Sequence, residues 1–182
     1  MDNLKDKFKK QIVKDLQKTL GLKNPQAVPQ MTKIVVNMGV KDALLDKKNL
    51  DKASIVLAQI TGQKPRWTSA KKSISTFKLR EGDKIGMMVT LRGKRMYDFF
   101  ERLVSIVLPR LRDFHGLGNK SFDGRGNYTI GFSESTVFPE IDSGKIDTIQ
   151  GFEVSIVCSA KTDKEGFALL KALGMPFQKG KS

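Results

Sequence analysis

The segment MMVTLRGKRMYDFFERLVSIVLPRL, residues 87–111, combines the two periodicities that decide the fold. Its first part alternates apolar and other side chains, which predicts a strand whose apolar face carries Met87, Val89 and Leu91. Its second part predicts a helix, because apolar residues recur every three or four positions, at Phe100, Leu103, Val104, Val107, Leu108 and Leu111. Pro109 is expected to end or kink that helix.

The same two periodicities recur on both sides of this segment. Helices are expected over residues 4–20, over 49–61 with Asn49 as N-cap, and after a capping box formed by Thr162 and Glu165. Further strands are expected over residues 33–38 and 152–158. The sequence therefore predicts a single α+β domain, residues 1–182, with one antiparallel-rich sheet and helices on one face.

The second face of this sheet is expected to stay open. On the strand that begins near Met87, the open face would carry Thr90 and Arg92, a hydroxyl and a guanidinium. These groups suit contact with phosphate and ribose better than burial in a core.

The composition points to a polyanionic partner. The 182 residues are 39% hydrophobic, which is enough for a real core. The chain has 33 Lys and Arg against 19 Asp and Glu, a formal net charge of +14. Because such a surface repels itself, nucleic acid is the first partner expected to neutralise it, and an anionic membrane surface is the second.

The chain is expected to be cytosolic. It has no run of about eighteen apolar residues that could span a bilayer, and MDNLKDKFKKQ at its start lacks the apolar centre of a secretory signal. The single cysteine, Cys158, allows no intrachain disulfide and fits a reducing compartment. Its thiol is expected to be buried and inert.

Residues suited to catalysis or metal binding are sparse, so the sequence predicts a protein that is not an enzyme and needs no cofactor. His115 is the only histidine, and no cysteine cluster accompanies it. GRGNYT (124–129) lacks the third glycine of a dinucleotide fingerprint, and the carboxylates of FPEID (138–142) have no evident acid–base partner. An enzyme acting on RNA, and a peripheral membrane protein using the basic helix over 4–20, remain alternatives.

Residues 68–84, TSAKKSISTFKLREGDK, predict a long, extended, basic hairpin loop. The stretch 64–84 carries seven cations and two carboxylates, together with Trp67, Phe77 and five Ser or Thr residues. Cations bind phosphate, hydroxyls can bond to phosphate or to the 2′-OH, and aromatic rings stack on exposed bases. We expect this loop to be mobile alone and ordered on RNA.

Six collinear segments carry a resemblance to a known family. They are NMGV (37–40), GQKP (62–65), TLRG (90–93), RLRDFHGL (110–117), KSFDGRGNYTIG (120–131) and FPEID (138–142). In this order, between an N-terminal helix and a C-terminal LGMPF, they resemble the bacterial large-subunit ribosomal protein L-five family.

The resemblance implies a non-enzymatic protein that binds 5S rRNA in the central protuberance of the large ribosomal subunit. An open, concave sheet face and adjacent loops would hold this RNA, through Asn37, Met38, Gly39, Gln63, Lys64, Thr90 and Arg92. The basic loop would contact the peptidyl-site tRNA through Lys71, Lys72, Ser73, Phe77, Lys78 and Arg80. A bridge to a small-subunit head protein would involve residues 133–146 with Arg110, Arg112 and Phe114. Large-subunit rRNA and neighbouring large-subunit proteins are further implied partners, with no membrane contact.

Two positions depart from the family's pattern. His115 stands where a basic residue is frequent, and SES (133–135) lacks the cation that the family leads one to expect. Both departures fall in the expected bridge region.

Overall fold

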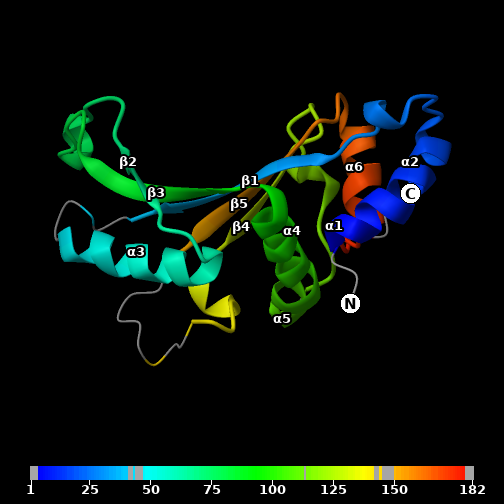
Figure 1. Cartoon of the computed structure of the whole chain (residues 1–182). Helices are drawn as coiled ribbons and strands as arrows, with labels where there is room; N and C mark the ends of the chain where they lie inside the picture. Colours follow the sequence, from blue (N-terminus) through cyan, green and yellow to red (C-terminus); the bar gives the residue numbers. More distant parts are fainter. Residues whose placement is uncertain are drawn as a thin grey trace. The chain divides into compact units, whose positions relative to one another are not determined.

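The computed structural model describes residues 4–40, 43, 47–112, 114–141, 144 and 150–178. The strands form one five-stranded antiparallel sheet with the order β2-β3-β1-β5-β4, and with the helices they make an α+β architecture (Figure 1). The strands are β1 (Met31–Gly39), β2 (Arg66–Ser69), β3 (Lys84–Leu91), β4 (Tyr128–Phe132) and β5 (Phe152–Cys158). The helices are α1 (Leu4–Lys7), α2 (Val13–Leu20), α3 (Lys47–Thr61), α4 (Gly93–Arg102), α5 (Leu108–Arg110) and α6 (Asp163–Ala172). The predicted fold class is confirmed.

The strands bury one face and leave the other partly exposed. On β3, Met87, Val89 and Leu91 are buried, as the alternation in the sequence predicts, whereas Met88 and Thr90 are half-buried. The same alternation runs along β1, β4 and β5. One face of the sheet therefore belongs to the core, and the other is available to a partner.

Two of the predicted helices contain a π-helical turn that the sequence pattern did not indicate. The N-terminal helix runs from α1 through the turn Phe8–Ile12 into α2 and ends at Gly21, whose φ of 65° is left-handed. The helix after β3 runs from α4 through the turn Leu103–Val107 into α5. Its backbone becomes extended at Leu111, so Pro109 lies just before the end of the helix, as expected.

The predicted capping box of α6 is present, but the Glu165 carboxylate bonds to the N–H of Lys161, one residue before the N-cap Thr162. The Thr162 hydroxyl accepts a hydrogen bond from the Glu165 backbone N–H at 3.4 Å, and the Glu165 carboxylate accepts one from the Lys161 N–H at 2.8 Å. The expected N-cap at Asn49 is wrong. Helix α3 begins at Lys47, so Asn49 lies within its first turn.

The chain divides into two compact units, each built from separate segments. Unit 1 comprises residues 1–34, 91–130 and 155–182, and unit 2 comprises residues 35–90 and 131–154. The single domain over residues 1–182 therefore stays a prediction. None of the helices in the described part of the chain is both long and apolar enough to cross a bilayer.

Aromatic contacts organise the core of each unit. In unit 1 the ring of Phe8 lies 6.2 Å from that of Tyr97, and a separate cluster joins Phe122, Tyr128, Phe167 and Phe177. In unit 2 Phe132 stacks on Phe152 at 4.7 Å with an interplanar angle of 8°. Figure 1 shows α3 alongside the unit 2 strands, and the helix contributes the fully buried Leu57 and Ile60.

Candidate nucleic-acid interface

The partly exposed side of the unit 2 strands forms the surface that we call the open face: Asn37, Arg66, Thr68, Met88 and Thr90. Strand register places the β2 and β3 residues together, because Arg66 lies opposite Met88 and Thr68 lies opposite Gly86. Asn37 lies on the neighbouring strand β1, on the side opposite to the buried Met38. Directly opposed residues of an antiparallel pair point to the same face. The open face therefore combines hydroxyls, an amide, a guanidinium and one thioether, with no carboxylate.

Gly86 allows three strands to approach closely beneath this surface. A Cβ atom at Gly86 would lie 2.7 Å from the Met38 carbonyl oxygen and 3.0 Å from the Thr68 hydroxyl. It would also lie 3.3 Å from the Cα of Gly39. A side chain at position 86 would thus push β1, which carries Gly39, and β2, which carries Thr68, away from β3.

Most of the residues predicted to bind 5S rRNA lie at or next to the open face. Asn37 and Thr90 belong to it, and Gly39 is exposed at the end of β1. The Gln63 side chain donates a hydrogen bond to the Thr90 carbonyl at 3.3 Å, which ties the loop after α3 to β3 and places the exposed Lys64 beside the strand end.

Arg92 and Met38 differ sharply in what they can offer a ligand. Arg92 is exposed, two residues beyond Thr90 in extended backbone, and its side chain makes no capping bond to α4. The prediction that Met38 contacts RNA is wrong for its side chain, which is fully buried on the core face of β1. The Met38 side chain is therefore left out of the interface proposed below.

The basic loop, residues 68–84, is a folded hairpin with its own hydrogen bonds. The β2–β3 ladder continues into it, where the Ala70 N–H donates to the Asp83 carbonyl at 2.9 Å, and Ile74 and Leu79 pair again nearer the tip. The Ser73 hydroxyl accepts a bond from the Glu81 N–H at 2.9 Å. Side chains therefore project from a defined backbone, and all those of residues 71–78 are exposed.

All six predicted loop residues are exposed: Lys71, Lys72, Ser73, Phe77, Lys78 and Arg80. Phe77 is 69% exposed, which is unusual for a phenylalanine. Lys78 adopts a left-handed φ of 52°, which is uncommon for a residue with a side chain. Strained backbone of this kind tends to occur where function requires a particular side-chain direction.

The residues predicted to form a bridge fall in two different units of the chain, and their role stays a prediction. Arg110 and Arg112 are exposed and Phe114 is half-buried, all in unit 1, whereas residues 133–141 belong to unit 2. The segment after Phe114 is held by the C-terminal segment: the Leu117 N–H donates to the Pro176 carbonyl at 2.9 Å, and the Gln178 N–H donates to the Leu117 carbonyl at 3.0 Å. The rest of the 133–146 region lies largely outside the described residues.

The second glycine of GRGNYT, Gly126, serves packing within the protein. The Asp123 carboxylate accepts bonds from the Arg125 N–H at 2.8 Å and from the Asn127 side chain at 2.6 Å. The bond from the Asn127 side chain is the main reason that the pKa of Asp123 is lowered. Gly126 is buried against Gly166 of α6, so its lack of a side chain permits contact between a turn and a helix.

The groups considered for catalysis lie in separate parts of the chain. Burial raises the pKa of the Cys158 thiol to about 12, as expected for an inert core residue. His115 is exposed, and the FPEI portion of FPEID forms a turn in which the Ile141 N–H donates to the Phe138 carbonyl at 3.1 Å. The described residues contain no group of three or more potential metal ligands.

Sequence reasoning missed Arg66 as a member of the open face. The sequence places this residue only within the cationic stretch, although its position opposite Met88 gives it the same orientation as Thr90. The alternation in β3 is visible in the sequence, but the register of β2 against β3 is not.

Comparisons with known proteins cover nearly the whole chain. A family model for the C-terminus of the ribosomal protein L5 family matches residues 84–177, and a second model, for ribosomal protein L5, matches residues 24–80. The chain is 56% identical over 178 residues to the large ribosomal subunit protein uL5 of Herpetosiphon aurantiacus, covering 98% of this chain and 99% of that protein. It is 54% identical over 175 residues to the protein of the same name from Anaeromyxobacter sp. (strain K), covering 96% and 97%. The protein of that name from Desulforapulum autotrophicum is 54% identical over 178 residues, covering 98% and 99%.

Proposed function

We propose, from the premise that this chain belongs to the ribosomal protein L5 family, that it binds 5S rRNA through the open face of its sheet. Family membership makes it a structural protein of the large ribosomal subunit, located in the ribosome and without enzymatic activity. The RNA, the binding face and the further contacts described below are proposals built on this membership.

The open face is the observation that supports 5S rRNA binding most strongly. It presents the Asn37 amide, the Arg66 guanidinium and the Thr90 hydroxyl on one surface. Lys64 lies beside it, and Arg92 follows Thr90 two residues further along the chain. Guanidinium and ammonium groups bind phosphate, while amides and hydroxyls can reach the 2′-OH and base edges of RNA. None of the five open-face residues is a carboxylate, so none of them would repel the phosphates of RNA.

We propose that the basic loop contacts the peptidyl-site tRNA. Its four cations, Lys71, Lys72, Lys78 and Arg80, would bind phosphates, and Phe77 would stack on an exposed base or pack on a ribose. The internal hydrogen bonds of the hairpin reduce the entropy lost when the loop binds. Arg110, Arg112 and Phe114 are proposed to contact a small-subunit head protein, together with residues 133–146.

Replacing Arg92 with alanine tests the proposed RNA face. We expect Arg92→Ala to weaken 5S rRNA binding by about 1–3 kcal/mol, a loss of roughly fivefold to 150-fold in affinity, because the guanidinium contacts RNA. The side chain caps no helix, so the thermal stability should not change. Filter binding or fluorescence anisotropy with labelled 5S rRNA provides the measurement.

Arg125→Ala is the matched control for this experiment. Arg125 is also exposed but lies on the Asp123–Asn127 turn, outside the proposed interface, and its replacement should leave the affinity within a factor of about two. Equal affinities for wild type and Arg92→Ala would mean that Arg92 does not belong to the RNA face. Turnover of RNA by the purified protein, or flotation with anionic liposomes, would instead favour the enzyme or the membrane alternative.

A further inference from the structure

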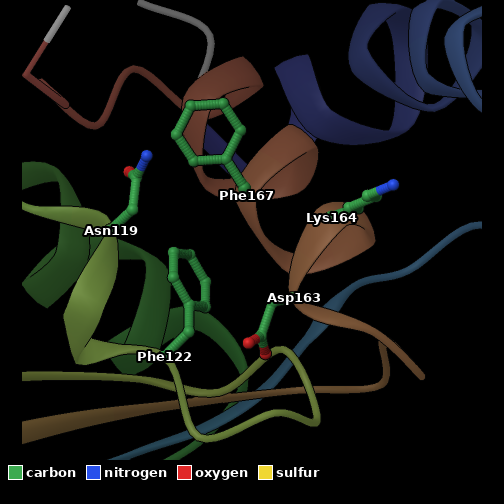
Figure 2. Close-up of a pocket in the computed structure, with 5 residues that line it drawn as sticks. All are labelled: Asn119, Phe122, Asp163, Lys164 and Phe167. Carbon is green, nitrogen blue, oxygen red and sulfur yellow. The ribbon is translucent and has the colours of Figure 1, made fainter. Parts of the chain in front are cut away.

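Unit 1 contains a pocket that the proposed 5S rRNA face does not use. It is lined by Asn119, Phe122, Asp163, Lys164 and Phe167, and its volume is about 310 Å³. These residues come from the turn before β4 and from the first two turns of α6 (Figure 2). A volume near 300 Å³ is at the small end of ligand sites, which suits one ring system rather than an extended chain.

Two phenylalanine rings provide apolar walls for this pocket. Figure 2 shows Phe122 and Phe167 with their rings on two sides of it, and their centroids are 6.5 Å apart at an interplanar angle of 62°. Both side chains are half-buried, so part of each ring remains accessible. Each ring packs on a further aromatic ring: the Phe122 centroid lies 4.7 Å from that of Tyr128, and the Phe167 centroid lies 4.6 Å from that of Phe177. The walls are therefore positioned before any ligand arrives.

Asp163 places a carboxylate beside these rings, and one of its oxygens already accepts a hydrogen bond from the protein. Its Oδ1 accepts a hydrogen bond from the Gly126 N–H at 2.9 Å, which fixes the orientation of the group. Its other oxygen, Oδ2, has no hydrogen-bond partner among the residues that the structure describes. A partly exposed, oriented carboxylate oxygen next to aromatic carbon can accept hydrogen bonds from a flat ligand that stacks on the rings.

The remaining two residues add a neutral amide and a cation. Asn119 is exposed and its side chain makes no hydrogen bond within the described part of the chain, so its amide can donate to a carbonyl of a ligand. Lys164 is exposed, and Figure 2 shows its side chain extending outward at the rim. A cation at the rim and a carboxylate inside favour a ligand with a hydrogen-bond-donating ring and an anionic tail.

We propose that this pocket binds a guanine base of a nucleotide, stacked against Phe122 or Phe167. Guanine is the base that presents two adjacent donors, N1–H and the 2-amino group. One would donate to Asp163 Oδ2 and the other to the second lone pair of Oδ1, which keeps its bond from the Gly126 N–H, and O6 can accept from Asn119. Uracil presents a single N–H between two carbonyl oxygens, which Asp163 repels, and the amino groups of adenine and cytosine each lie next to a ring acceptor. The phosphate of the nucleotide lies toward Lys164.

The guanine has two sources, an unpaired guanosine of ribosomal RNA or a free guanine nucleotide. Only the first source rests on the proposed function of the chain. In single-stranded RNA, sequence is read by stacking unpaired bases on aromatic side chains and bonding to their edges, which is the chemistry that this pocket offers.

An amide NMR titration of the full chain with GMP, AMP, CMP and UMP tests the proposal. GMP is expected to shift signals of residues 119–126 and 163–167, with a dissociation constant at least about tenfold below those of the other three. Asp163→Asn keeps a side-chain oxygen for the Gly126 N–H but loses the carboxylate, so the preference for GMP should disappear. Asn119→Ala, which removes an exposed side chain, should weaken GMP binding severalfold. Asp15→Asn removes the same charge from α2 and should change nothing.

A uridine heptamer with one central guanosine separates the two sources. Tighter binding of the heptamer than of GMP at these residues identifies RNA as the source, and the reverse identifies the free nucleotide. Equal shifts by all four nucleotides, spread over the lysine-rich surface, would overturn the proposal as nonspecific phosphate binding. Tighter binding of N-acetyl-arginine amide than of GMP would overturn it in favour of a peptide side chain. Asp163→Asn should retain 5S rRNA binding. A negative result for guanine binding therefore leaves the proposed 5S rRNA function untouched, and loss of that function would be seen separately.

Discussion

Gly166→Ala is expected to destabilise the protein by about 2 kcal/mol, although alanine is the better helix former. A Cβ atom at position 166 would lie 2.7 Å from the Cα of Gly126 and would also clash with the Gly126 carbonyl oxygen. Overpacking of this kind costs about 3 kcal/mol, against about 1 kcal/mol gained from helix propensity.

Gly126 cannot move away from such a side chain without further loss. Its N–H donates to Asp163, and on its other side a Cβ at Gly126 itself would meet Ala160 at 2.7 Å. Thermal unfolding should therefore show a fall in Tm of roughly 4–8 °C for Gly166→Ala. Gly118→Ala is the matched control, because nothing lies within 4 Å of a Cβ there and φ is −76°, so its Tm should stay the same or rise slightly. An unchanged Tm for Gly166→Ala would show that the turn and the helix are not in rigid contact.

Replacing Lys71, Lys72, Lys78 and Arg80 together with alanine is expected to weaken peptidyl-site tRNA binding at least about tenfold in ribosomes that carry the variant. Each phosphate contact contributes about 0.7–0.9 to the slope of log affinity against log salt concentration, so losing four contacts should lower that slope by roughly three. Folding and 5S rRNA binding should remain close to those of the wild type. The backbone bonds between Ile74 and Leu79 do not involve the replaced side chains.

A control with the same change in charge distinguishes a specific contact from a general loss of cations. Lys9, Lys14, Lys18 and Lys23 are exposed on and beside the N-terminal helix, outside the loop. Their replacement by alanine should leave tRNA binding within about threefold of the wild type. Equal losses in the two quadruple variants would mean that net charge, and not the loop, governs tRNA binding. Unfolding of the loop variant would show that the loop is structural.

Local patterns in the sequence predicted the elements and the covered face of the sheet. The alternation through Met87, Val89 and Leu91 identified the buried side of β3, and the spacing of Thr162 and Glu165 identified the start of α6. These predictions succeeded because each depends on residues within one or two turns of each other.

Met38 shows how a motif can mislead where periodicity would not. The motif NMGV suggests that its residues face the RNA as a unit, but consecutive residues of a strand point to opposite sides of the sheet. Met38 has the same parity as the buried Ile34 and Val36, so the alternation already placed it in the core.

Contacts between distant segments could not be derived from the sequence. The packing of Gly126 on Gly166 joins residues 40 positions apart, and the segment GRGNYT by itself gives no sign of this contact. The register that places Arg66 opposite Met88 depends on the whole hairpin between them. Each feature requires the tertiary structure, and each changes which residues are assigned to the interface.

Cross-linking of the protein to 5S rRNA with ultraviolet light, followed by mass spectrometry of the linked peptides, tests most directly whether the open face holds RNA. The proposed function predicts that the linked residues include Lys64, Arg66 or the 88–92 segment, and that their yield falls as salt rises. Cross-links confined to α3 and the N-terminal helix, with none on these strands, would contradict the assignment of the open face.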